Sequence, residues 1–126
     1  MKQVTLLEQQ EAVGLDTGQL RALHARLGQS GAEDLVCRAL EDIALRLSHA
    51  GHCYREARPG ELRKTAQGIG AAAEQIGLHL LARVAADVAA CIGTGDRTAL
   101  GATLARLLRV GERSLCEAWE LQDLSI

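Results

Sequence analysis

An unbroken apolar stripe in the first half of the chain limits the fold more than any other feature. Its members follow one another at intervals of four and three residues: Val36, Leu40, Ile43, Leu47, Ala50 and Tyr54. This spacing places all of these side chains on one face of an α-helix about five turns long. A long helix with one narrow apolar face needs other helices to cover that face. We therefore expect a helical bundle.

The composition agrees with an all-α fold. Hydrophobic residues make up 48% of the chain but aromatic residues only 2%, and leucine and alanine provide most of the apolar mass. Leucine and alanine favour helices, whereas strands favour the aromatic and β-branched residues that are scarce here. A length of 126 residues suits one domain and is too short for two ordinary ones.

Capping residues and glycines divide the rest of the chain into further helices. Asp16 is placed to cap a short helix that ends at Gly28, and Asp96 to cap the last helix. We expect an antiparallel up-down four-helix bundle with an additional short N-terminal helix as a lid across one end. Residues 1–14 would form an N-terminal arm and residues 15–126 the bundle domain. The long helices are expected over residues 32–58, 60–76, 78–92 and 96–118.

The same periodicity predicts which side chains lie inside the bundle. Leu27, Tyr54 and Leu108 are expected on the inner faces of their helices. The four cysteines are expected to be reduced and mostly to line the core. The residues predicted to form the centre of the core are Leu40, Ile43, Ile69, Val84, Leu104 and Leu107.

Charge and hydropathy exclude several classes of partner. The net charge of −2 lacks the basic excess typical of nucleic-acid-binding proteins. The most apolar stretch, residues 68–92, is interrupted by charged and polar side chains and is not expected to span a membrane. Residues 1–13 have no apolar run long enough for a signal peptide. We therefore expect a cytoplasmic protein without a nucleic-acid or membrane partner.

The predicted third helix carries an unusual cluster of small residues on its polar side. Gly68 and Gly70 each cost about 1 kcal/mol relative to alanine inside a helix. Helical geometry points Gln67 away from the core, because it lies nearly opposite Ile69. A surface of this kind lets another protein approach closely. Chance use of small residues, or close packing against a neighbouring helix, would explain it equally well. The residues on or near this outer side are Arg63, Lys64, Gln67, Gly70, Ala71 and Glu74.

Four stretches of the chain resemble the histidine-containing phosphotransfer (HPt) domain family. They are the leucine-rich run Leu15-Asp16-x-x-x-Leu20-x-x-Leu23-x-x-x-Leu27-Gly28, the run Arg58-Pro-Gly-Glu-Leu-Arg-Lys-Thr-Ala66, and the downstream segments 81–85 and 94–100. Aligned on this pattern, the chain has Gln67 where the family has its phosphorylated histidine. It has Gly70 in place of the family's lysine and Ala71 in place of its glycine.

These departures decide the expected chemistry. The nitrogen of a carboxamide is not a nucleophile, because its lone pair is delocalised into the carbonyl, so Gln67 cannot accept a phosphoryl group. The resemblance then implies a degenerate, non-catalytic HPt-like signalling module, with no enzyme activity and no cofactor. Its partner would be a response-regulator receiver domain or a histidine kinase. The expected partner-binding residues are Arg63, Lys64, Gln67, Gly70, Ala71 and Glu74.

Three alternatives remain open at the level of sequence. An active phosphotransfer protein would need another histidine, and His79 is the best placed, although it lies about a dozen residues beyond Gln67. A structural or oligomerising bundle would have no signalling role. His49 has His52 and Cys53 three and four residues further on, so either pair could share a metal. No further ligand has diagnostic spacing, and no metal is therefore expected.

Overall fold

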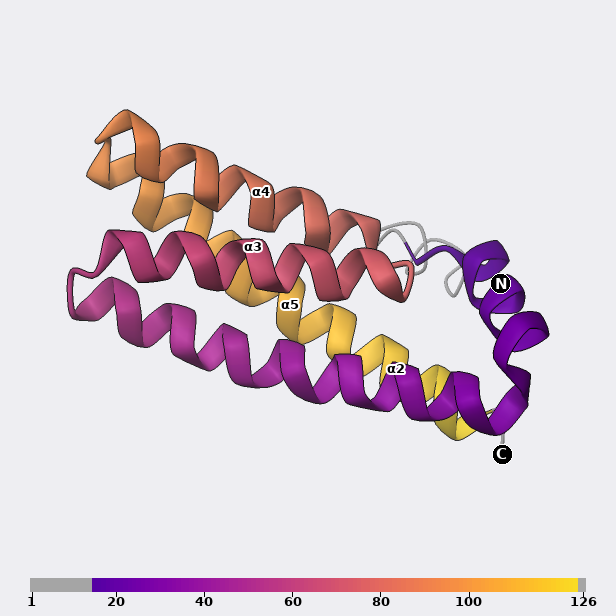
Figure 1. The fold of residues 1–126 in the computed structure, drawn as a ribbon. Helices are drawn as coiled ribbons and strands as arrows, with labels where there is room; N and C mark the ends of the chain where they lie inside the picture. Colours follow the sequence, from indigo (N-terminus) through magenta and orange to yellow (C-terminus); the bar gives the residue numbers. More distant parts are fainter. Residues whose placement is uncertain (1–14, 125–126) are drawn as a thin grey trace, which may run out of the picture.

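The computed structural model describes residues 15–124, and each of the named elements in this range is an α-helix (Figure 1). The expected arm over residues 1–14 lies outside the described residues. None of these helices is long and apolar enough to cross a membrane. The four helices are α2 (Thr17–Arg55), α3 (Pro59–Gln75), α4 (His79–Thr94) and α5 (Arg97–Leu124).

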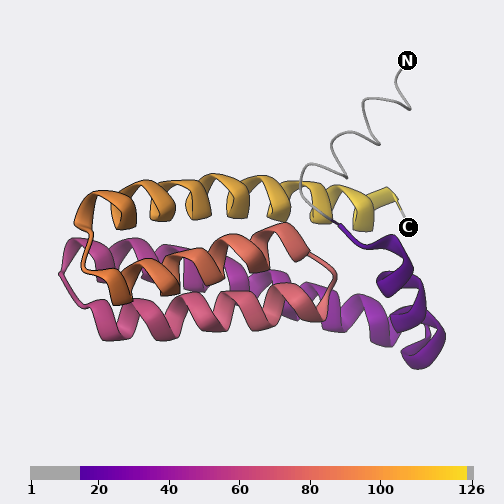
Figure 2. The same ribbon diagram turned by 90° about the horizontal axis from the view of Figure 1, so that it is seen from above.

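The helices lie lengthwise beside one another, and the chain turns back at each short connection (Figure 2). Each helix packs on its neighbour in the chain, and α5 also packs on α2. In the part of the chain that the structure describes, α3 has no close backbone approach to α5, and α2 has none to α4. The arrangement is therefore a four-sided bundle in which α3 and α5 are diagonally opposite.

A single hydrophobic core fills the bundle. It consists mainly of leucine, isoleucine, valine and alanine from all four helices. None of the six residues predicted for its centre is more than 4% exposed, which confirms the prediction for Leu40, Ile43, Ile69, Val84, Leu104 and Leu107.

The start of α2 has the expected cap and an interruption at the expected Gly28, but the connection expected after Gly28 is absent. The Asp16 carboxylate accepts a hydrogen bond of 3.0 Å from the backbone N–H of Gln19, as an N-cap does. Gly28 has φ 76° and ψ 168°, a conformation essentially restricted to glycine, and it bends the helix there. Residues 29–31, expected in a connection, belong instead to the helix. The residues before Gly28 turn across one end of the bundle (Figure 1).

Three residues expected inside the bundle lie partly outside it. Leu27 is 44% exposed, because it directly precedes the bend and the apolar stripe does not continue through it. Tyr54 is 41% exposed and lines a cavity at the end of the bundle. Leu108 is 36% exposed at a shallow groove between α2 and α5. The expectation for the cysteines is also wrong in part: all four are free, but Cys53 alone is buried and Cys116 is exposed.

Candidate functional site

The six residues of the expected partner surface all lie on α3, and we call this set the α3 face. Gln67 and Ala71 are exposed near the middle of the helix, which agrees with the predicted orientation away from Ile69. Arg63 and Lys64 are exposed one turn earlier. The α3 face therefore presents an amide and a methyl group beside two cationic side chains. Its members are Arg63, Lys64, Gln67, Gly70, Ala71 and Glu74.

The two unusual glycines of α3 have different surroundings. The guanidinium of Arg46 on α2 lies where a Cβ at Gly68 would be. This end of a flexible side chain is 42% exposed and can move aside, so packing does not require glycine at position 68. Gly70 was expected to face outward, but it is half-buried and faces α4. A Cβ at position 70 would lie 3.8 Å from the Ala82 carbonyl oxygen, which is an ordinary contact. Packing therefore does not require glycine at position 70.

A shallow groove of about 630 Å³ runs between α3 and α4 beside the exposed amide of Gln67. One basic group of this groove, Arg83 of α4, was not among the residues predicted from the sequence. The sequence did contain a pattern that places Arg83 beside His79, because His79, Arg83 and Ala86 follow one another at helical spacing on one side of α4. The lining consists of Ala66, Gln67, Gly70, Glu74, His79, Ala82, Arg83, Ala86 and Ala89.

His79 lies at one end of this groove between two carboxylates. Its Nδ1 is 3.0 Å from Oε2 of Glu74, and its Nε2 is 3.1 Å from Oδ2 of Asp16. The hydrogen bond to Glu74, followed by that to Asp16, raises the pKa of His79. Both ring nitrogens therefore donate in the protonated form, and neither offers a lone pair to a phosphoryl group.

The segment before the bend in α2 is fastened to the connection between α3 and α4. The backbone N–H of Asp16 donates to the Gly77 carbonyl at 2.8 Å. The Gln19 side-chain amide donates to the carbonyl oxygens of Glu74 and Gln75 at 2.5 and 3.2 Å. The backbone N–H of Gln19 and then His79 lower the pKa of Asp16. These contacts lie at the Glu74 end of the groove, whereas Ala66, Gln67 and Gly70 line the rest of its α3 side.

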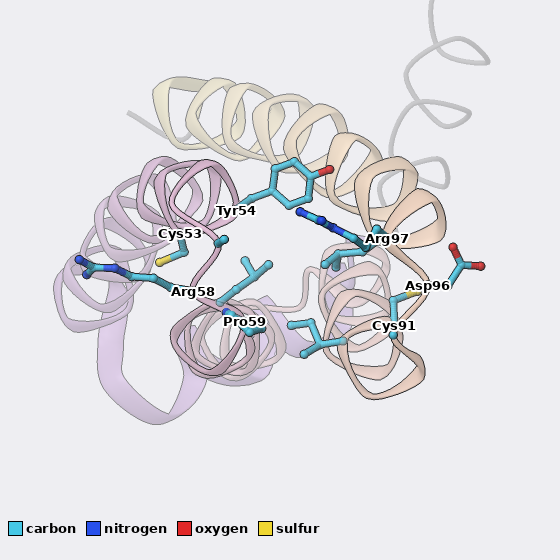
Figure 3. Close-up of a pocket in the computed structure, with 12 residues that line it drawn as sticks. Cys53, Tyr54, Arg58, Pro59, Cys91, Asp96 and Arg97 are labelled. Atoms are coloured by element: carbon cyan, nitrogen blue, oxygen red, sulfur yellow. The ribbon is translucent and has the colours of Figure 1, made fainter.

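A separate cavity of about 410 Å³ lies at the opposite end of the bundle (Figure 3). The connection between α2 and α3 and the connection between α4 and α5 border it. Figure 3 shows the Arg97 side chain pointing inward, whereas the Asp96 carboxylate points away. Apolar side chains such as Leu62 and Leu100 provide much of the wall. This cavity does not include any member of the α3 face.

A comparison of the chain with protein-family models, curated proteins and solved structures finds no match in any of the three.

Proposed function

We propose that this protein is a non-catalytic HPt-like module that binds a receiver or histidine-kinase domain through the α3 face. In this proposal the fold is an antiparallel up-down four-helix bundle with a short N-terminal helix before Gly28. The observation that carries the proposal is the exposure of Gln67 in the middle of an outward helix face, at the position where the resemblance has the phosphorylated histidine.

The chemistry of the α3 face supports binding without phosphoryl transfer. Gln67 has no nucleophilic nitrogen, and Gly70 supplies no cation for an incoming phosphoryl group. Arg63 and Lys64 remain exposed on α3, and Arg83 lines the α4 side of the groove. Receiver domains of phosphorelays carry an acidic pocket, which these cations would complement. Electrostatic complementarity of this kind chiefly accelerates association and selects the partner.

The contacts of His79 disfavour the alternative of an active phosphotransfer protein. A nucleophilic imidazole needs one unprotonated nitrogen, whereas both nitrogens of His79 face carboxylates. Gln67 also precedes Glu74 by seven residues, which is about 10 Å along the helix axis. A partner centred on Gln67 would therefore have His79 at the margin of its footprint.

The proposal is tested by a matched pair of alanine-to-arginine variants. Ala71→Arg places a long cation in the α3 face, while Ala105→Arg places the same side chain on the exposed surface of α5, diagonally opposite. Binding would be measured by calorimetry against receiver and histidine-kinase domains from the same organism. We expect Ala71→Arg to abolish binding and Ala105→Arg to preserve it. Equal binding by both variants, or no binding of any such domain by the wild type, would refute the proposal.

A second variant tests whether the site geometry of a phosphotransfer domain survives. Gln67→His restores the nucleophile, and Gly70→Lys restores the cation in a position where the added Cβ makes only ordinary contacts. We expect the double variant to accept phosphoryl groups from a phosphorylated receiver, with an acid-labile product. The single variant Gln67→His is the control that shows how much of the transfer depends on the added lysine. An inert double variant that still binds the receiver would retain the docking role and refute the preserved geometry.

A further inference from the structure

A nitrogen, a sulfur and an oxygen ligand converge where the end of α2 meets the start of α3. His49 and Cys53 are four residues apart on one face of α2, and Glu61 comes from the first turn of α3. One donor atom from each residue lies within 4.8 Å of the other two. The sequence indicated His49 with either His52 or Cys53, all on α2, and did not indicate Glu61, which the turn between the helices brings to His49 and Cys53.

Two distances in the structure fit the edges of a coordination tetrahedron. Zinc binds histidine nitrogen and carboxylate oxygen at about 2.0 Å and thiolate sulfur at about 2.3 Å, so tetrahedral ligands lie about 3.3 Å (N to O) and about 3.5 Å (N to S) apart. Nε2 of His49 is 3.3 Å from Oε1 of Glu61 and 3.4 Å from Sγ of Cys53. The third pair, Sγ of Cys53 and the carboxylate of Glu61, lies within 4.8 Å, and a rotation of the Glu61 side chain, which is 43% exposed, would shorten this edge.

In any one protonation state, a hydrogen bond at Nε2 of His49 joins only one of the other two ligand atoms. Nε2 of His49 carries either one proton or one lone pair, so it cannot donate to Glu61 and accept from the thiol of Cys53 in the same state. With the proton on Nε2, the contact to sulfur lacks a hydrogen bond from the thiol. Without that proton, the lone pair of Nε2 faces the carboxylate oxygen of Glu61. A cation between the three atoms would satisfy all of them.

The surroundings allow a metal ion to enter and be held. The side chain of His49 is 46% exposed, whereas Cys53 is fully buried, so the three ligands lead from the surface inward. Arg58 donates to Oε2 of Glu61 at 3.3 Å, which leaves Oε1 directed at His49. Such outer contacts orient a carboxylate ligand. In Figure 3 the sulfur of Cys53 points away from the cavity, on the side where Arg58 extends.

We propose that His49, Cys53 and Glu61 form a zinc site that joins α2 to α3, with a water molecule as the fourth ligand. The mixed nitrogen, sulfur and oxygen donors favour zinc over magnesium or calcium, which prefer oxygen alone. On binding, the metal displaces the thiol proton of Cys53 to the solvent and leaves a thiolate–zinc bond. The site does not include the α3 face, so it does not depend on the proposed docking function.

The test uses the full chain in its reduced form and two metals. Cobalt(II) reports on the ligands, because a tetrahedral site with a thiolate gives strong visible bands and a sulfur-to-metal charge-transfer band. Zinc affinity is then measured by competition with cobalt. We expect the wild type with cobalt to show the visible bands and the charge-transfer band, and we expect added zinc to abolish them. Absence of the charge-transfer band would overturn the proposal.

Matched variants identify the ligands. His49→Ala and His52→Ala remove neighbouring exposed histidines, but His52 instead pairs with Glu56, 3.5 Å away. We expect His49→Ala to weaken zinc binding by at least about 100-fold, the upper range for loss of an outer-shell partner, while His52→Ala has little effect. Glu61→Gln and Glu56→Gln form a second such pair. Equal zinc affinities within either pair would overturn the proposal. Because all four positions are exposed, the test does not depend on replacing the buried Cys53.

Discussion

Ile69→Ala tests the packing that orients the α3 face. Ile69 is fully buried on the inner side of α3, and the substitution removes Cγ1, Cγ2 and Cδ1. At about 0.8 kcal/mol for each buried carbon group, the lost transfer free energy is roughly 2.4 kcal/mol. The cavity that remains adds to this cost. We therefore expect the free energy of unfolding to fall by about 3–4 kcal/mol, within the range for isoleucine-to-alanine changes in cores.

The assay is urea unfolding followed by circular dichroism. The midpoint should fall while the slope with denaturant stays the same, because the surface exposed on unfolding hardly changes. Gln67→Ala is the control on the same helix and should change the free energy of unfolding by less than about 0.5 kcal/mol, since Gln67 is exposed. A loss below about 1 kcal/mol for Ile69→Ala would refute the packing. A comparable loss for Gln67→Ala would remove its amide from the docking surface.

Three further substitutions test local features. Gly77→Ala should cost about 1–3 kcal/mol in thermal or urea unfolding, because φ is +83° and the new Cβ would lie 3.1 Å from a backbone oxygen; Gly60→Ala, which meets nothing within 4 Å, should not destabilise. Ser114→Ala should raise the free energy of unfolding by about 1 kcal/mol, since the buried hydroxyl has no hydrogen-bond partner within residues 15–124; an unchanged or lower midpoint would contradict this. The pKa of His79 is raised, first by Glu74, so its stabilisation is complete below the ordinary histidine pKa and is lost as pH rises through the raised value. His79→Ala should therefore lower the free energy of unfolding more at about pH 5.5 than at about pH 9, and equal losses at the two pH values would refute the ion-pair account.

The fold could be predicted well because its causes are local and periodic. The spacing around Leu40 and Ile43 gave the inner face of α2, and the same argument placed Ile69 inside and Gln67 outside. An interruption at Gly28 was also expected, but as the end of a separate short helix and not as a bend within α2. Periodicity failed at Leu108, where a shallow groove between α2 and α5 leaves a residue of the apolar stripe partly exposed.

The site was less predictable, since its contacts join residues far apart in the chain. The sequence around Asp16 predicts a helix cap, but nothing in that segment indicates that the carboxylate also forms a hydrogen bond with His79. Glu61 similarly belongs to a different helix from His49, and only the turn between α2 and α3 brings them together. The position of Gly70 against α4 also depends on how two helices pack, which their separate patterns do not specify.

The central claim, that the α3 face binds a receiver or kinase domain, is tested most directly by an NMR titration. Amide chemical shifts of the isotope-labelled chain would be followed while an unlabelled receiver or histidine-kinase domain that binds it is added. The largest shifts should occur at Lys64, Gln67 and Ala71 and along the α4 side of the groove at Arg83. Shifts confined to α5, or to the cavity around Tyr54 at the opposite end of the bundle, would contradict the claim.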